Sequence, residues 1–229
     1  YEIMPSRVGS EMCIRDRLKD TYGYEQFRNL EIYDDLFKNK ETLYISQGQL
    51  IENVIREVEK AQNGETTVDN ILLTAPTGSG KSLLFQLPAI YLGNEYNLLT
   101  IVVSPLKALI VDQVESLQDI GYKRVAYASS DLSPEQKADV YRQVHDGEID
   151  LFYLSPELLL SYDIKHFVGE RRIGLVVVDE AHTVTTWGKE FRVDYWFLGR
   201  YLNLLKQNLG YNFPLFALTA TAVWNPKGG

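Results

Sequence analysis

Residues 75–82, in the order Ala-Pro-Thr-Gly-Ser-Gly-Lys-Ser, have the residue types and the spacing of a loop that binds phosphate. Gly78 and Gly80 let backbone N–H groups converge on phosphate oxygens, and a helix that begins after them adds the positive end of its dipole. Lys81 would reach the outer phosphates of a nucleotide, and the Ser82 hydroxyl would hold Mg²⁺. The expected phosphate-binding residues are Thr77, Gly78, Ser79, Gly80, Lys81 and Ser82.

An acidic pair, Asp179 and Glu180, comes directly after the apolar run 175–178. Such a pair at the end of a strand could also do no more than cap a helix. In a chain that carries a phosphate-binding loop, Asp179 is expected to be a Mg²⁺ ligand and Glu180 to orient or deprotonate an attacking water. Two buried carboxylates without a metal would be unfavourable. We therefore expect Lys81, Asp179 and Glu180 to form a catalytic centre.

The segments that must position these residues alternate between strand and helix patterns. Apolar residues at helical spacing predict a helix over 49–62, and shorter helices are expected over 23–30 and 32–38. Several strands are apolar on both faces, as in a parallel sheet covered by helices on both sides. These patterns predict an α/β fold with a mostly parallel central sheet. Strands are expected over 70–74, 99–104, 124–128, 150–155, 175–179 and 214–219, and further helices over 82–92, 108–119, 134–144 and 195–209.

Residues 1–17 match neither helix nor strand periodicity and are expected to be foreign to the rest of the chain. The string from Met4 to Arg17 resembles translated sequencing-adapter read-through in assembled environmental sequences, and the alternative is a natural flexible N-terminus. If the first interpretation holds, Cys13 is not native. Residues 18–229 contain no repeat or linker and are expected to form one domain.

The composition is that of an ordinary globular protein, with a net charge of −8. This charge argues against coating nucleic acid through bulk charge, although it permits a local track of phosphate contacts. The single cysteine excludes an internal disulfide, and no apolar run approaches the length of a membrane span. We expect a cytoplasmic protein without a membrane partner. His145, His166 and Asp150 fit no spacing of metal ligands and are interpreted as ordinary surface or core residues.

The two motifs above, together with Leu-Thr-Ala-Thr-Ala at 218–222, resemble motifs I, II and III of superfamily 2 DEAD/DEAH-box helicases. Residues 104–109 with Asp112 and Gln113 resemble motif Ia, and 153–158 resemble a later DNA-contact motif. The resemblance implies the first RecA-like domain of such a helicase, a P-loop NTPase fold that binds ATP and Mg²⁺. His182 either begins a helix or, as the resemblance implies, couples the nucleotide site to Thr219 and Thr221 of motif III.

Residues 179–195 are similar to the aromatic-rich loop of RecQ helicases, as are residues 23–28 to a segment upstream. Thr183 and Lys189 depart from the usual Cys and His of that family. RecQ proteins also continue Phe-Arg directly into the Gln that recognises adenine, whereas in this chain Asn-Leu-Glu comes after Phe27-Arg28. We expect Gln49 to take this role because it precedes the helix that leads to the phosphate-binding loop, with Gln47 and Gln26 as alternatives.

The same resemblance implies where nucleic acid would bind. Trp187 is expected in a loop, where its ring could stack on a base, while Phe191 has core packing as its alternative. Hydroxyl, ammonium and exposed amide groups near motif Ia would hold the sugar–phosphate backbone. The expected nucleic-acid contacts are Ser104, Pro105, Lys107, Ser155, Trp187, Phe191 and Arg192.

We therefore expect the ATP-binding domain of a RecQ-like, ATP-dependent DNA helicase with 3′–5′ polarity. The alternatives are an RNA helicase, a double-strand DNA translocase of a defence system, and a nucleotide-gated nucleic-acid-binding module without enzymatic activity. Superfamily 2 motors need a second RecA-like domain, which we expect in a longer parent chain. The present chain alone is expected to hydrolyse ATP poorly.

Overall fold

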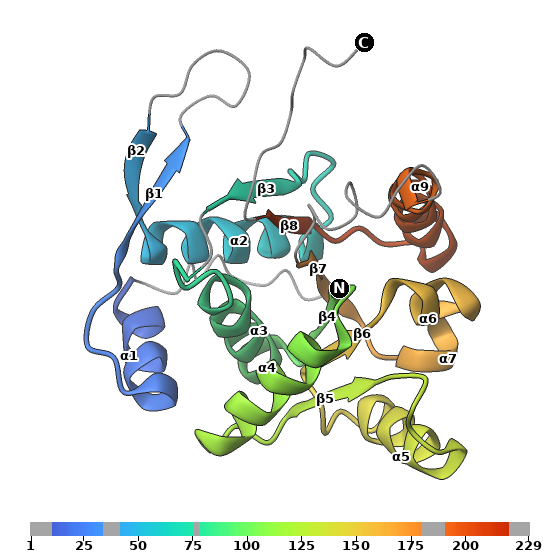
Figure 1. Cartoon of the computed structure of the whole chain (residues 1–229). Helices are drawn as coiled ribbons and strands as arrows, with labels where there is room; N and C mark the ends of the chain where they lie inside the picture. Colours follow the sequence, from blue (N-terminus) through green and yellow to red (C-terminus); the bar gives the residue numbers. More distant parts are fainter. Residues whose placement is uncertain (1–10, 34–41, 76–77, 180–190, 220–229) are drawn as a thin grey trace.

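Six parallel strands form the central sheet of the computed structural model, which describes residues 11–33, 42–75, 78–179 and 191–219 (Figure 1). The strand order is β3-β8-β7-β4-β6-β5, and each hydrogen-bonded pair is parallel. The α/β prediction is confirmed. The strands are β3 (Ile71–Thr74), β4 (Leu99–Val103), β5 (Val125–Ala128), β6 (Leu151–Leu154), β7 (Ile173–Val178) and β8 (Leu215–Thr219).

Helices cover both faces of this sheet. One face packs against α2 (Gln47–Gln62), α3 (Leu83–Tyr96) and α4 (Lys107–Asp119), and α1 (Glu11–Tyr22) packs in turn on α2 and α3. The other packs against α5 (Pro134–His145), α6 (Pro156–Ser161), α7 (Ile164–Val168) and α9 (Phe191–Leu209). In β4, Val102 faces the first layer whereas Ile101 and Val103 face the second. The alternation of the strand thus explains why it is apolar on both faces.

The N-terminal part differs from the sequence prediction. Residues 23–30 do not form a helix: β1 (Asn29–Tyr33) pairs antiparallel with β2 (Thr42–Ser46). The predicted helix over 32–38 is likewise wrong at 32–33, which belong to β1, and the rest of it lies outside the described residues. Local propensity is overridden here because a distant segment supplies the hydrogen-bonding partner.

Residues 11–17, in which the sequence shows neither helix nor strand periodicity, lie in α1. Ile14 and Leu18 are four residues apart and almost completely buried in the core. This spacing places both side chains on one face of the helix, where they pack toward α2 and α3. The boundary expected between residues 17 and 18 therefore falls inside a helix.

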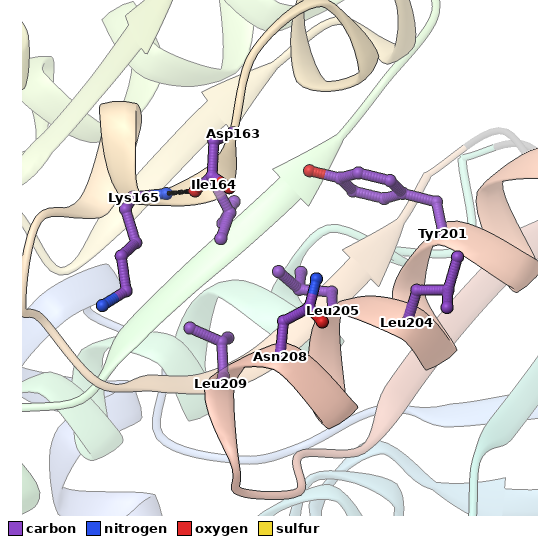
Figure 2. A pocket seen from close by; sticks show the side chains of 8 residues that line it. All are labelled: Asp163, Ile164, Lys165, Tyr201, Leu204, Leu205, Asn208 and Leu209. Carbon is purple, nitrogen blue, oxygen red and sulfur yellow. Dashed lines mark hydrogen bonds between the residues drawn. The ribbon is translucent and has the colours of Figure 1, made fainter.

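A hollow lies between α7 and α9 on the second face of the sheet (Figure 2). Ile164, Leu205 and Leu209 give it apolar walls, and Tyr201 lies at its margin. It is lined by none of the residues expected to contact nucleotide or nucleic acid. Across the described residues, no helix is both long and apolar enough to cross a membrane.

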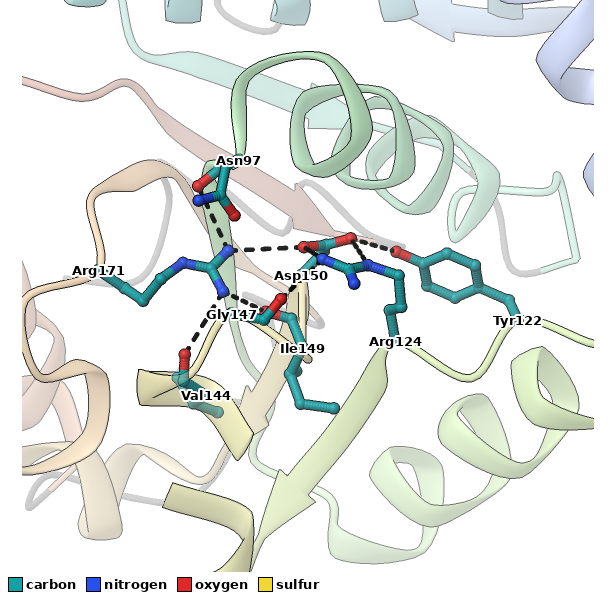
Figure 3. Close-up of polar contacts among 8 residues, drawn as sticks. All are labelled: Asn97, Tyr122, Arg124, Val144, Gly147, Ile149, Asp150 and Arg171. Carbon is teal, nitrogen blue, oxygen red and sulfur yellow. Dashed lines mark hydrogen bonds and ion pairs between the residues drawn. The ribbon is translucent and has the colours of Figure 1, made fainter. Parts of the chain in front are cut away.

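A buried charge cluster joins the amino ends of the sheet, with Asp150 at its centre (Figure 3). Asp150 is completely buried and precedes β6. Arg124, which precedes β5, donates from its Nη2 to Asp150 Oδ1 at 2.7 Å, and the Tyr122 hydroxyl donates to Oδ2 at 3.2 Å. Arg171, before β7, lies 3.5 Å from Oδ1 and also donates to the Asn97 carbonyl before β4.

The contacts of Asp150 agree with its interpretation as an ordinary core residue, because they stabilise the fold and leave the carboxylate no role in binding a ligand. Burial lowers the pKa of Arg171, and the Asp150 charge opposes that shift. Helix α3 approaches so closely that a Cβ at Gly93 would overlap the Asp150 carboxylate. The residues that precede β4, β5, β6 and β7 are thus distant in the sequence, but the Asp150 carboxylate and its partners connect them.

We predict that Asp150→Ala destabilises the chain by about 3–5 kcal/mol, because it leaves the buried Arg171 guanidinium without its charge partner. Urea unfolding gives the free energy. The matched control is Asp146→Ala, which removes an exposed ion pair to Arg142 and is expected to cost at most about 1 kcal/mol. Equal losses in the two variants would show that the cluster contributes no more than a surface pair.

Candidate functional site

The phosphate-binding loop connects the end of β3 to the start of α3, as predicted. Gly78 and Gly80 have φ values of 80° and 83°. Residues other than glycine adopt this backbone conformation only with strain. The Ser79 hydroxyl is buried without a hydrogen-bond partner among the described residues. A buried polar atom of this kind suits a ligand with hydrogen-bonding oxygens, as a phosphate has. Of the expected loop residues, Thr77 lies outside the described part of the chain.

Lys81 and Ser82 lie at the start of α3. Lys81 is 8% exposed, and its Nζ donates to the Ala75 carbonyl at 3.0 Å. Ser82 is the N-cap of α3, but its hydroxyl does not cap the helix. Residues 84–93 of this helix are all buried, so the core fixes the position of its N-terminus and hence of the loop. The N-terminal amides and the ammonium make this corner favourable for anions.

Asp179 comes directly after β7 and is 4% exposed. Its backbone N–H donates to the Val103 carbonyl at 2.9 Å, and its Oδ2 accepts a hydrogen bond from Gln113 Nε2 at 3.1 Å. The strands β3 and β7 are parallel, and only β8 lies between them in the sheet. The phosphate-binding loop and Asp179 therefore both come at the carboxyl ends of the strands. Glu180 and His182 lie outside the described residues.

The donors that would hold Mg²⁺ are the Ser82 hydroxyl and the Asp179 carboxylate. Hard oxygen donors of this type fit Mg²⁺, which takes one or two protein ligands and completes its shell with water and phosphate. The described residues hold no group of three or more His, Cys, Asp and Glu that could bind a metal by themselves. The residues present therefore fit a metal that arrives with a nucleotide.

The structure places Gln47, rather than Gln49, against the phosphate-binding loop. Gln47 is 3% exposed, its Nε2 lies 3.5 Å from the Gly80 carbonyl, and its Oε1 accepts from the Arg28 N–H at 3.0 Å. Gln49 is exposed, and its side chain accepts from the Ser46 N–H to complete a capping box at the start of α2. The structure therefore favours the alternative Gln47 over the expected Gln49, because the side-chain oxygen of Gln49 is engaged at the start of its own helix.

The remaining alternative, Gln26, is exposed. A signal in the sequence could have separated the two candidate glutamines at the start of α2, because Ser46 and Gln49 have the S-x-x-Q spacing of a capping box. That pattern assigns Gln49 to the helix start and leaves Gln47 for the loop.

The expected nucleic-acid contacts of motif Ia lie at the same edge of the sheet. Ser104 comes after β4, is 1% exposed, and its hydroxyl has no partner among the described residues. Pro105 is half-buried. Lys107 begins α4, is exposed, and forms an ion pair with Asp131. Ser155 comes after the neighbouring β6, where its hydroxyl caps α6 by accepting from the Leu158 N–H at 3.3 Å.

Other predicted contacts fall where side chains are not described. Trp187 and Thr221 lie outside the described residues. Phe191 and Arg192 belong to the first turn of α9, and Thr219 ends β8. Sequence reasoning missed Gln86 and Tyr153 as parts of the site, although both are buried close to it; their types and positions in the sequence carried no signal of their hydrogen bonds.

The comparisons with known proteins agree with this geometry. Residues 44–227 match the DEAD/DEAH box helicase family. The chain is 42% identical over 94% of its length to an ATP-dependent DNA helicase RecQ from Synechocystis, and covers 38% of that protein. It is 38% identical over 72% of its length to a probable ATP-dependent DNA helicase RecS from Bacillus subtilis, covering 30% of it. It is 35% identical over 71% of its length to the ATP-dependent helicase SGS1 from Saccharomyces cerevisiae, covering 11% of it.

Among solved structures, the crystal structure of the DUF1998 helicase MrfA superimposes with a TM-score of 0.61 at 22% identity. The match covers 98% of the present chain and 31% of MrfA. At this identity the likeness concerns the fold, which is that of a helicase RecA-like domain. The chain thus spans well under half the length of the curated relatives named above.

We predict that Gly80→Ala is more destabilising than Gly64→Ala. Both glycines have positive φ, so both variants carry the strain of about 1–2 kcal/mol that alanine has in this conformation. A Cβ at Gly80 would also lie 2.8 Å from Gln47 Nε2, whereas a Cβ at Gly64 would meet nothing within 4 Å. Urea unfolding of both variants measures the difference. Equal losses would show that Gln47 does not pack against the loop as described.

Proposed function

Because the chain belongs to the DEAD/DEAH box helicase family, we propose that it is the ATP-binding domain of a RecQ-like, ATP-dependent DNA helicase. One observation carries the proposal: the loop with Lys81 and the buried Asp179 leave the parallel sheet at one edge, separated by a single strand. The similarity to RecQ proteins over most of the chain supports the narrower assignment.

In this proposal each residue of the site has a distinct task. The amides of the loop and the α3 N-terminus bind the phosphates, and the Lys81 ammonium exchanges the Ala75 carbonyl for phosphate oxygens. Ser82 and Asp179 hold Mg²⁺, which when bound neutralises phosphate charge. Glu180 orients or deprotonates the attacking water. The Gln47 amide would pair with both the donor and the acceptor of the adenine edge by exchanging its present partners, the Arg28 N–H and the Gly80 carbonyl, for the base.

Nucleic acid is proposed to lie along the carboxyl ends of β4 and β6, beside the nucleotide. Ser104, Lys107 and Ser155 are carried by these neighbouring strands and the helices that come after them. Trp187 and Arg192 are proposed to add a stacked base and a phosphate contact. DNA is the proposed substrate because the RecQ and RecS relatives named above are DNA helicases.

Coupling and unwinding are proposals for a longer protein, since the chain covers only part of its relatives. His182, Thr219 and Thr221 are proposed to couple the nucleotide site to nucleic acid. A second RecA-like domain, closing over the nucleotide, is proposed to complete the 3′–5′ motor, and the separate domain is proposed to hydrolyse ATP slowly.

We predict that Lys81→Ala weakens binding of a fluorescent ATP analogue by about tenfold or more, because a hydrogen bond from a charged group contributes about 1.5–3 kcal/mol. Fluorescence titration in Mg²⁺ gives the Kd. Lys137→Ala, which alters a half-buried lysine on α5, is the control and should bind as wild type does. Unchanged affinity in the Lys81 variant would contradict the phosphate-binding assignment.

We further predict that Gln47→Ala, but not Gln49→Ala, reduces the preference for ATP over GTP. Loss of a hydrogen-bonded amide is worth about 0.5–1.5 kcal/mol, so the ratio of the two Kd values should fall by roughly twofold to tenfold. Competition titrations with both nucleotides measure the ratio, which is insensitive to a general loosening of the loop. If the preference is lost in Gln49→Ala and kept in Gln47→Ala, the assignment from the structure is wrong.

A further inference from the structure

A continuous chain of side-chain hydrogen bonds leads from the Asp179 carboxylate into the core. Gln113 Nε2 donates to Asp179 Oδ2 at 3.1 Å, and the Tyr153 hydroxyl donates to Gln113 Oε1 at 2.9 Å. Behind Tyr153, Gln86 Nε2 donates to the tyrosine oxygen at 3.2 Å. The Tyr22 hydroxyl at the end of α1 then donates to Gln86 Oε1 at 3.0 Å. Every donor in this chain points toward the carboxylate.

The middle and the end of this chain are shielded from water, whereas Gln113 and Tyr22 are half-buried. Tyr153 is completely buried, Gln86 is 6% exposed and Asp179 is 4% exposed. Burial raises the pKa of both Tyr153 and Tyr22, so each hydroxyl keeps the proton that it donates at neutral pH. In such an interior, hydrogen bonds are stronger than in water, and successive ones polarise each other.

This arrangement sets the orientation of the Gln113 amide. Tyr153 donates its only proton to the Gln113 carbonyl, while its oxygen accepts from Gln86. A reversed Gln113 amide would place its carbonyl oxygen against the Asp179 carboxylate and its NH₂ group against the tyrosine proton. Both contacts would be repulsive, so the reversed amide is disfavoured. Gln113 is therefore held with its donor facing the carboxylate.

The chain also connects elements with different expected tasks. Gln86 lies on α3, which begins at the phosphate-binding loop, and Gln113 lies on α4, which begins with Lys107. Tyr153 is two residues before Ser155 on β6. The carboxylate at the end of β7 is thus held by residues of the elements that carry the expected phosphate and nucleic-acid contacts.

We propose that Gln113, oriented by Tyr153, is a positioning residue that fixes the Asp179 carboxylate for the binding of Mg²⁺ with the nucleotide. The inference rests on the proposed function. Asp179 is the residue that would touch the metal, and Gln113 acts through it. Partners that orient metal ligands in this way are typically worth about 10–100-fold in metal affinity.

The test measures Mg²⁺-dependent binding of a fluorescent ADP analogue to the 229-residue chain. Titrations in excess Mg²⁺ and in EDTA give two Kd values, and their ratio reports the contribution of the metal. In Gln113→Leu the Kd in Mg²⁺ should rise by about tenfold or more, while the Kd in EDTA stays at the wild-type value. A residue with only a packing role would raise both values together, leaving the ratio unchanged.

Two further variants separate positioning from folding. Gln118→Leu removes another glutamine of α4, whose Nε2 donates to the Val125 carbonyl, and should leave the ratio at the wild-type value. Tyr153→Phe keeps the buried ring but removes the hydroxyl that orients Gln113. It should shift the ratio in the same direction as Gln113→Leu, by a smaller factor, and it decides the question if Gln113→Leu does not fold.

The outcomes distinguish this inference from the proposed function. Wild-type binding that depends on Mg²⁺, with an unchanged ratio in Gln113→Leu, overturns the positioning role alone. If Gln113→Leu does not fold, an unchanged ratio in Tyr153→Phe does the same. Wild-type chain that binds no nucleotide, or binds it equally well in EDTA, overturns the proposed function and this inference with it.

Discussion

The parallel pairing of the six strands is the constraint on which the rest of the structure depends. Parallel strands need crossover connections, and their helices cover both faces, so the strands must be apolar on both sides. As a consequence, every strand ends at the same edge. The loop after β3, Asp179 after β7, Ser104 after β4 and Ser155 after β6 therefore meet along one edge, although up to about a hundred residues separate them in the sequence.

Polar groups buried at the two ends of the sheet have opposite roles. At the amino ends, Asp150 is surrounded by Arg124, Arg171 and Tyr122, so its charge is matched within the fold. At the carboxyl ends, the Asp179 carboxylate accepts a hydrogen bond from the Gln113 amide. Asp150 thus has a structural role, whereas a metal-ligand role is proposed for Asp179.

The central α/β part could be predicted because its signals are local. Runs such as 99–103 are apolar on both faces, and the helix over 49–62 shows its period directly; in the structure these segments are β4 and α2. The hairpin of β1 and β2 could not be predicted in this way, because each strand depends on a partner beyond residues 34–41. The burial of Ile14 and Leu18 was missed because their four-residue spacing spans the boundary that we expected after residue 17.

For the candidate site, the residue types in 75–82 and at 179 were sufficient to propose which groups bind phosphate and metal. The choice between Gln47 and Gln49 depended on which of the two side chains forms the capping box at the start of α2. The partners of Asp150 and Asp179 depended on contacts between residues that are distant in the sequence. Hydrogen bonds across 66 residues, as between Gln113 and Asp179, have no periodicity that a single sequence could display.

A crystal structure of the chain with Mg²⁺ and a non-hydrolysable ATP analogue would test the assignment of the nucleotide site. The outer phosphates should contact the backbone of residues 78–82 and the Lys81 ammonium, with Mg²⁺ bound by Ser82 and Asp179. The adenine should lie against Gln47. A nucleotide bound elsewhere, or one whose phosphates do not contact Lys81, would contradict the assignment of this edge as the site of ATP binding.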